Sequence, residues 1–316
     1  MSSVSAKVSE YEPVTRWAKV PHGISFGAGA NSVAVDSGDR IIIFNRGTDP
    51  VAIFDRDGNF LDSWGHGEFV NPHGITIGPN GDLYLIDDLG HFVQRRSPDG
   101  KVLLTLGTPR QAAEPQSGKP FNRPTHVAVS ANGEIFVTDG YGNSRIHHFA
   151  EDGKLLGGWG MPGTEPGQFS LPHNVCWTSK GTLAVCDREN HRVQFFHPDG
   201  SFAGQWHFHR PVAIATRPDL NPYIYLVELG PDGIQRGVPN IGLKVRIVDE
   251  DGQVLQTFGD GTLGSGSRQF IAPHGIAVDS AGDVYIAEVS ASSLKAHDGI
   301  TSLGETVSLR KWRVVS

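Results

Sequence analysis

The sequence predicts an all-β fold and, within that class, a six-bladed β-propeller. The 316-residue chain contains 40 glycines and 20 prolines, a composition typical of many short strands joined by tight turns. Asn-Gly and Asp-Gly pairs recur between alternating apolar runs, and such pairs are strong hairpin signals. A unit of roughly 40 to 50 residues recurs six times along the chain. Because units of this size cannot bury their own faces, they must pack side by side, and a closed ring of four-stranded blades is the usual solution.

The first repeat defines the blade. Asn31–Asp36 and Gly38–Phe44 alternate in hydrophobicity and flank a tight turn, so we expect two paired strands. Pro50–Asp55 and Gly58–Trp64 supply two more strands. The unit is therefore a four-stranded meander.

The later repeats follow the same pattern. We call the first residue of each repeat its opening, and in the later repeats these residues are His73, Thr125, His173, Val212 and His274. The sixth has only three good strands, His274–Asp279, Asp283–Glu288 and Ser308–Val315. Tyr11–Lys19 can supply the fourth, which would close the ring and cover an exposed edge. We therefore expect a single propeller domain over residues 11–316, preceded by a disordered N-terminus at residues 1–10.

Composition excludes several classes of function. The net charge is −7 and no long Lys/Arg run occurs, which argues against nucleic-acid binding. The N-terminus has no apolar signal-peptide region, and no run approaches membrane-spanning length, so neither export nor a membrane partner is expected. The two cysteines, Cys176 and Cys186, are expected to be buried thiols, which fits a reducing cytoplasm. The oligomeric state is left open.

Propeller topology predicts a candidate metal site. Each inner strand starts on one face of the disc, so the opening residues form one ring around the axis: Asn31, His73, Thr125, His173, Val212 and His274. The three histidines come from alternate blades and would aim their imidazoles at one point. Three neutral imidazoles with an open fourth position suit catalytic zinc, or another divalent ion. The alternative is a copied Pro-His opening whose histidines merely line the channel.

The ends of the second strands reach the same face. There we find Arg46, Asp88, Asp139 followed by Tyr141, Asp187, Glu228 and Glu288. Most of the acids are expected to turn loops by accepting backbone hydrogen bonds. Arg46 could clamp a substrate carboxylate or pair with a neighbouring aspartate. Tyr141 could act as an acid or base, or make a structural hydrogen bond.

Four segments carry a resemblance to a known family. They are Phe121–Thr125, Asp139–Arg145, Gly167–His173 and Asp187–Asn190. Together they resemble the peptidyl-α-hydroxyglycine α-amidating lyases, within the wider group of NHL-repeat propellers. The likeness runs from about Val33 to the C-terminus.

The resemblance implies a function and a set of site residues. In that family three histidines at these motif positions hold a catalytic zinc, which here implies His73, His173 and His274. It also implies that Tyr141 and Arg46 act on the substrate. The implied reaction cleaves a carbinolamine C–N bond, releasing an amide and glyoxylate without a redox step. We further expect His126, Asp139, Asp187 and Arg188 to bind substrate or to support the site.

Departures from the family pattern limit these implications. Gly275 stands where the family has a calcium-binding aspartate, which argues against a structural calcium. Ala272 replaces a methionine, and His126 replaces an aspartate. Gly142 replaces a cysteine, in keeping with a reduced compartment. No segment resembles the copper monooxygenase partner domain, so we expect a small-molecule substrate and not a peptide hormone.

Two other classes of function stay open: a metal-dependent hydrolase acting on a lactone or ester, and a non-enzymatic interaction platform. Three long segments bear on the choice, namely Thr108–Pro120, Leu229–Leu243 and Val289–Val307. We expect them on the histidine face, where they would wall in a pocket, because long irregular connections in a compact fold are usually functional or disordered.

Overall fold

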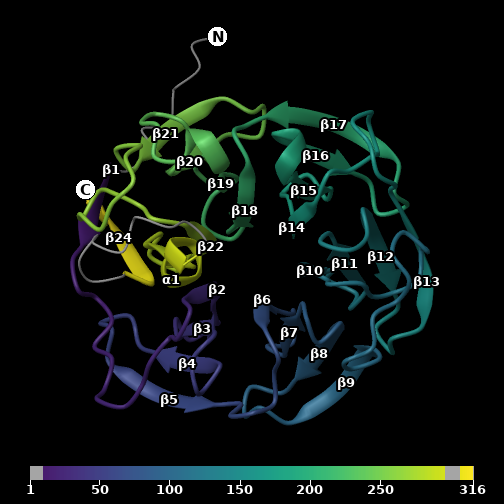
Figure 1. The fold of residues 1–316 in the computed structure, drawn as a ribbon, viewed down its shortest axis with the longest axis horizontal. Coiled ribbons are helices and arrows are strands. Elements are labelled where there is room, and N and C mark those ends of the chain that lie inside the picture. The colour runs from purple at the N-terminus through teal and green to yellow at the C-terminus, as the bar shows by residue number, and fades with distance from the viewer. Residues whose placement is uncertain (1–9, 296–306, 316) are drawn as a thin grey trace.

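The computed structural model describes residues 10–295 and 307–315, and these form six four-stranded antiparallel sheets around a central axis (Figure 1). The predicted all-β, six-bladed propeller is confirmed. Helical structure in the described residues is confined to α1 (Ser290–Lys295) and two 3-10 turns, η1 (Arg188–Asn190) and η2 (Gly233–Gln235). None of the described helices is long and apolar enough to span a bilayer.

The strands follow the chain blade by blade, inner strand first. The first three blades are β2 (Ala30–Val35), β3 (Ile41–Asn45), β4 (Val51–Phe54) and β5 (Phe60–Trp64); β6 (Pro72–Ile77), β7 (Leu83–Asp87), β8 (Phe92–Arg96) and β9 (Val102–Gly107); and β10 (His126–Val129), β11 (Ile135–Asp139), β12 (Arg145–Phe149) and β13 (Leu155–Trp159). The last three are β14 (Pro172–Trp177), β15 (Leu183–Asp187), β16 (Arg192–Phe196) and β17 (Phe202–His207); β18 (Pro211–Thr216), β19 (Ile224–Glu228), β20 (Lys244–Val248) and β21 (Val254–Phe258); and β22 (Pro273–Val278), β23 (Val284–Glu288), β24 (Leu309–Val315) and β1 (Glu10–Val14).

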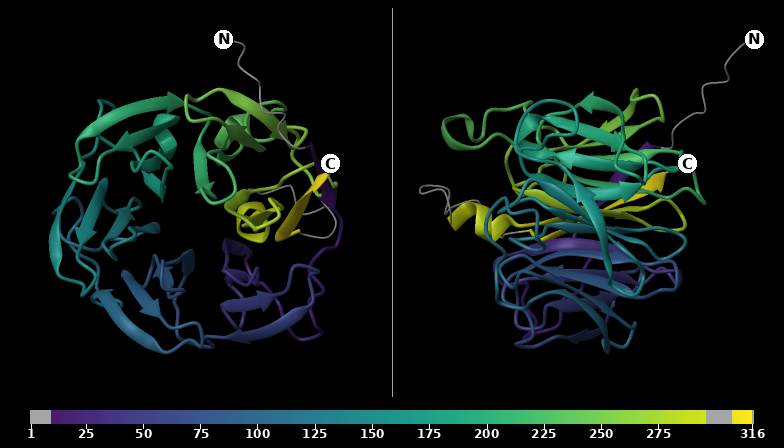
Figure 2. Two further views of the ribbon diagram at one scale, coloured as in Figure 1. Left: turned by 180° about the vertical axis from the view of Figure 1, so that it is seen from behind. Right: turned by 90° about the vertical axis from the view of Figure 1, so that its right-hand side faces the viewer.

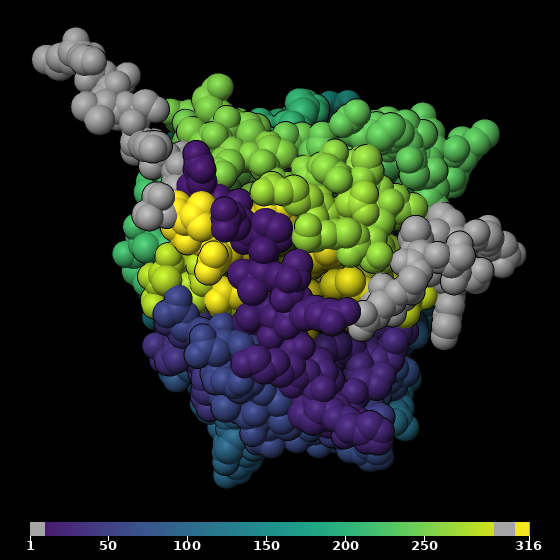
Figure 3. Space-filling view, turned by 90° about the vertical axis from the view of Figure 1, so that its left-hand side faces the viewer, coloured from purple at the N-terminus to yellow at the C-terminus, as the bar shows by residue number. Residues whose placement is uncertain are grey.

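The N-terminal strand closes the ring, as predicted. β1 pairs with β24 in antiparallel register, with Tyr11 opposite Val314, and Figure 3 shows this segment lying against the C-terminal strand. The strand is shorter than Tyr11–Lys19, because after Val14 the chain crosses to the first blade. There the indole of Trp17 donates a hydrogen bond to the carbonyl of Arg56 at 2.8 Å. Of the N-terminus expected to be disordered, residues 1–9 lie outside the described residues, and Glu10 begins β1.

The core lies between neighbouring blades. Between the third and fourth blades, for example, Phe136, Phe169, Val175 and Phe196 form one buried cluster. Second strands such as β15 are buried along their whole length, whereas outer strands such as β13 are largely exposed. Cys186 is buried and Cys176 partly buried, and both are free thiols, as expected. Interblade packing thus fixes the inner strands, whose first residues carry the candidate site.

Two of the three long segments project from the same face of the disc. Figure 2 shows α1, within Val289–Val307, and the Leu229–Leu243 loop on one side of the molecule. Val289–Val307 is therefore partly helical, and its residues 296–306 lie outside the described residues. The remaining long segment, Thr108–Pro120, packs on the loop after β11. There the backbone N–H of Gln116 donates to Asn143 Oδ1 at 2.7 Å.

Candidate metal centre

The histidines occupy β-bulges at the start of the inner strands. In the second blade Pro72 pairs with Asp87 and Gly74 with Ile86, so His73 is the extra residue between them. The same shift surrounds His173 in β14 and His274 in β22. A bulge re-aims the side chain of its extra residue, and a proline, which lacks an N–H, is tolerated at the start of a strand or at a bulge. The repeated Pro-His pair therefore turns each imidazole toward the axis.

Backbone carbonyls of the neighbouring blades fix the orientation of the three rings. Nδ1 of His73 donates to the Thr125 carbonyl at 2.8 Å, Nδ1 of His173 to Val212 at 2.7 Å, and Nδ1 of His274 to Asn31 at 2.8 Å. The acceptors are the three non-histidine members of the predicted ring, so the predicted ring of six openings is confirmed. Because each Nδ1 carries the proton, each Nε2 presents a lone pair.

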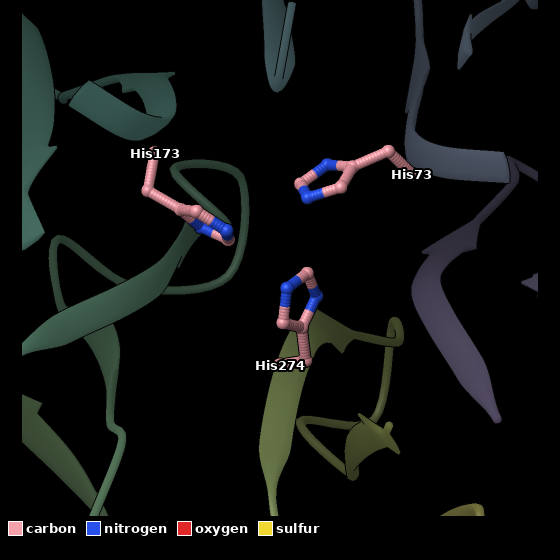
Figure 4. Close-up of side chains that lie close together, drawn as sticks. All are labelled: His73, His173 and His274. Atoms are coloured by element: carbon pink, nitrogen blue, oxygen red, sulfur yellow. The ribbon is translucent and has the colours of Figure 1, made fainter. Parts of the chain in front are cut away.

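These lone pairs face one another. Potential ligand atoms of His73, His173 and His274 lie within 4.8 Å of one another, and Figure 4 shows the rings converging from three strands. Burial lowers the pKa of all three imidazoles well below the ordinary value, and the positive charge of Arg188 lowers it further; Arg46 adds to this effect at His73 and His274. The rings are therefore neutral at physiological pH, which is the form that binds metal.

Tyr141 adds a hydroxyl to this cluster. Its oxygen lies 3.0 Å from Nε2 of His73 and 3.2 Å from Nε2 of His173. The guanidinium of Arg123 lies 4.6 Å from the centre of the tyrosine ring and that of Arg188 lies 5.8 Å away, so cation–π contacts hold the ring in place. One phenolic O–H cannot satisfy three lone pairs.

The donor set fits a divalent cation of the zinc type. Three neutral imidazoles with fixed Nδ1–H bonds are the ligands of many catalytic zinc sites, and the backbone acceptors supply the outer contacts that such ligands need. No carboxylate of a described residue belongs to the cluster. Calcium, which prefers six or more oxygen ligands, fits this cluster poorly.

Carboxylates at the ends of the second strands position the openings. Asp87 accepts the N–H of Asn71 at 2.9 Å, and Glu288 accepts those of Ile271 and Ala272 at 2.7 and 3.0 Å. Asp187 likewise accepts the N–H of Ser170 at 2.7 Å. These bonds tie down the residues just before the histidines, as expected of loop-turning acids.

A second ring lies one or two residues beyond these acids. Each member donates its backbone N–H to the carbonyl two residues before an opening: Arg46, Asp88, Tyr141, Arg188, Leu229 and Val289. The predicted equivalence of Arg46 and Asp88 with Asp139 and Asp187 is therefore wrong. Asn45 ends β3 where Asp187 ends β15, so Arg46 is the counterpart of Arg188.

Five members of this second ring line a pocket of about 250 Å³ that also contacts His274. The Leu229–Leu243 loop and α1 complete its wall with Arg236, Ser292 and Ser293, as predicted for these two segments. Thr108–Pro120 does not line it, so the prediction that this segment walls in the pocket is wrong. Arg46 donates from Nη1 to Ser292 Oγ at 3.2 Å, and its buried Nε has no hydrogen-bond partner among the described residues.

The other predicted site residues are placed differently. The carboxylate of Asp139 accepts hydrogen bonds from Asn122, Asn143 and His147. The carboxylate of Asp187 accepts one from Arg192 at 2.8 Å. Neither carboxylate therefore reaches the pocket. Arg188 does line the pocket.

His126 is not one of the three clustered histidines, although its imidazole lies beside Gly74 and lowers the pKa of His73. It lines a separate hollow of about 650 Å³, walled by the far ends of the inner strands, at the other end of the channel. The role predicted for His126 in substrate binding or in support of the site stays a prediction.

The sequence did not single out Arg123, Arg210 and Arg236. Arg123 pairs with Asp88 at 2.7 Å, and Arg210 pairs with Glu189 at 2.8 Å. Arg123 and Arg210 stand two residues before two of the three openings that lack histidine, at φ of 62° and 38°. That common place in the repeat was a usable signal. Arg236 lies in an irregular loop and carried none.

The comparisons with known proteins agree with this architecture. A model of the NHL repeat matches residues 121–149 and 169–196. The six-bladed propeller therefore carries NHL repeats. It is 34% identical over 253 residues to peptidyl-alpha-hydroxyglycine alpha-amidating lyase 1 of Drosophila melanogaster, an alignment covering 72% of this chain and 44% of that protein. It is 29% identical over 290 residues to human NHL repeat-containing protein 3, covering 85% and 79%.

The NHL-repeat propeller is also 32% identical over 251 residues to peptidyl-glycine alpha-amidating monooxygenase B of Xenopus laevis, covering 74% of this chain and 27% of that one. It thus spans less than half of these amidating relatives. Among solved structures, a streptogramin B lyase has a TM-score of 0.60 at 14% identity, with 98% of each chain covered. A gluconolactonase from Xanthomonas campestris has a TM-score of 0.57 at 14% identity, covering 91% and 86%. These two likenesses concern the fold alone.

Proposed function

We propose that this propeller is a zinc-dependent lyase that cleaves the C–N bond of a small carbinolamine-type substrate. The observation that carries the proposal is the convergence of three neutral imidazoles on one point beside the hydroxyl of Tyr141. The identity to an amidating lyase, 34% over 253 residues, supports the same class of reaction.

The proposed metal ligands are His73, His173 and His274. When bound there, a zinc ion would act as a Lewis acid that makes a substrate hydroxyl easier to deprotonate. The carbonyls of Thr125, Val212 and Asn31 keep the imidazoles in the tautomer that this role requires.

Tyr141 is the proposed proton carrier. Its hydroxyl is the acid–base group nearest the imidazoles, and the arginines over its ring keep it in place. In the reaction the substrate hydroxyl loses its proton, the C–N bond breaks, a C=O bond forms, and the leaving nitrogen gains a proton. Proton and electron counts balance without an oxidant.

Arg46 is the proposed anchor for the carboxylate of the substrate. Burial lowers the pKa of its guanidinium, yet arginine stays charged in proteins. Its side chain has no carboxylate partner within ion-pair distance among the described residues, so its charge is available to a ligand. The pairing with an aspartate considered from the sequence is not observed, since Asp88 pairs with Arg123 instead.

The choice of lyase over hydrolase follows from the acids. Related lactonase chemistry would use an oxygen-rich calcium site, whereas Asp88, Asp139 and Asp187 all bond to protein groups. An assay with N-benzoyl-α-hydroxyglycine and, separately, gluconolactone tests the choice. We expect benzamide and glyoxylate from the first and no acceleration of the second. Turnover of the lactone alone would support the hydrolase, and no turnover of either would favour an interaction platform.

A further inference from the structure

The pocket beside the histidines is strongly cationic. Four arginines line it: Arg46, Arg188, Arg210 and Arg236. Asp232 also lines it, and Glu189 pairs with both Arg188 and Arg210, at 2.7 and 2.8 Å. Four guanidinium groups against two carboxylates leave two positive charges among the described residues. A single substrate carboxylate would neutralise only one of them.

Among the described residues, the positive charge of Arg210 is paired with a carboxylate, whereas those of Arg46 and Arg236 are not. Arg210 is bonded to both oxygens of Glu189 and to the Gly230 carbonyl. Arg236, in contrast, donates only from Nη2 to Ser293 Oγ, at 3.0 Å, and its buried Nε has no hydrogen-bond partner among the described residues. Arg46 makes the same limited contact with Ser292. A guanidinium offers five N–H donors, and burying one unpaired is costly.

The two arginines reach the pocket from different blades. Arg46 follows β3 of the first blade, Arg236 lies in the loop after β19 of the fifth, and α1 belongs to the sixth blade between them (Figure 1). They contact different serines of α1, Ser292 and Ser293, so each guanidinium can take an anionic group of its own. Asp232 is close enough to raise the pKa of Arg236, but burial is the larger effect and lowers that pKa.

We propose, on the basis of the lyase function proposed above, that the substrate carries two anionic groups. The group at the reacting end lies at Arg46, and a second at the remote end is bound by Arg236. The planar fork of arginine matches a carboxylate or a phosphate equally well. A pocket of about 250 Å³ is below the range usual for drug-sized ligands, so the molecule is a short dianion.

Calorimetric titration of the intact protein tests the second subsite without turnover. The probes are succinate, glutarate and adipate, each matched with the monocarboxylate of the same carbon number. We expect the best dicarboxylate to bind about tenfold or more tightly than its partner, the worth of one charge-assisted contact. An ω-phosphonocarboxylate of the same length identifies the second group: tighter binding than the dicarboxylate indicates phosphate, and weaker binding indicates carboxylate.

Arg236→Gln should remove the dicarboxylate advantage while leaving monocarboxylate binding within about twofold. Arg40→Gln is the control of equal charge: Arg40 pairs with Asp36 at the other end of the channel, and its loss should change neither affinity. Equal binding of mono- and dicarboxylates by the parent protein would overturn the inference, as would an equal loss of both in Arg236→Gln.

These outcomes are separable from those of the lyase assay. A protein that prefers dicarboxylates but does not cleave the carbinolamine contradicts the proposed reaction and keeps the second subsite. A protein that cleaves the carbinolamine but does not prefer dicarboxylates keeps the lyase and loses the subsite.

Discussion

The hydroxyl oxygen of Tyr141 lies 3.0 Å from Nε2 of His73, although the two residues belong to different blades and are 68 positions apart in the chain. Nδ1 of His73 is committed to the Thr125 carbonyl, so Nε2 must accept. The same hydroxyl lies 3.2 Å from His173, yet it has only one hydrogen to donate. Tyr141 is thus placed between the imidazoles and the pocket.

Tyr141→Phe should lower kcat by about a hundredfold or more, because proton transfer by a positioned side chain contributes that much. Zinc content and unfolding free energy should stay close to those of the parent protein. Tyr223→Phe, a partly buried phenol in the core of the fifth blade, is the control. Steady-state kinetics that match the parent would return Tyr141 to a packing role.

Arg46→Lys should not restore function, since lysine keeps the charge but loses the fork that grips a carboxylate. We expect kcat/KM to fall by about tenfold or more, mainly through a higher KM, for lack of a bidentate contact. The measurement is initial rate against substrate concentration at two salt concentrations. A fully active lysine variant would mean that Arg46 acts only as a point charge.

The buried imidazole of His126 should make the stability of the folded protein depend on pH. Burial lowers the pKa of His126 from 6.5 to about 4, and its Nδ1 has no hydrogen-bond partner among the described residues. The unfolded chain therefore binds a proton below pH 6.5 that the folded chain refuses. Stability from this group is full above pH 6.5 and is lost as the pH falls toward 4, by about 2 kcal/mol between pH 7 and pH 5.

Urea unfolding of the parent and of His126→Gln at both pH values tests this contribution, because the three metal-site histidines are present in both proteins. The variant should lose less stability on acidification. Equal losses would show that His126 is protonated in the folded state.

Shortening the Leu229–Leu243 loop at Ile234–Val238, which removes exposed Ile234 together with Arg236 of the pocket wall, should raise KM or change selectivity without loss of zinc. The two ends of the loop stay packed together in this variant, since Leu243 is buried and packs over Gly230. Metal content and a substrate panel are the measurements. A shortened protein that treats every substrate as the parent does would remove this loop from the pocket argument.

The repeat made much of this site predictable. Its register alone placed His73, His173 and His274 on one ring with Thr125, because a propeller copies the same strand start into each blade. The bulges were not predictable, since they depend on a register shift between inner and second strands that side-chain pattern does not encode. Arg46 was aligned one residue too early for a different reason, since Asn45 and not Arg46 is the residue that ends the second strand where Asp187 does.

Ion pairs between neighbouring blades could not be predicted from the sequence either. Arg123 with Asp88, and Arg210 with Glu189, join residues from neighbouring repeats whose contact depends on loop conformation. Arg236 lies in a loop with no counterpart in the other blades, so neither periodicity nor repeat position could mark it.

Metal analysis of protein purified without a histidine tag tests the central claim most directly. His173→Ala removes one proposed ligand, and His66→Ala, at an exposed loop residue, is the matched control. We predict about one zinc per chain in the parent and in His66→Ala, and its loss from a folded, inactive His173→Ala protein. A metal-free parent with full activity, or a His173→Ala protein that keeps its zinc, would contradict the account.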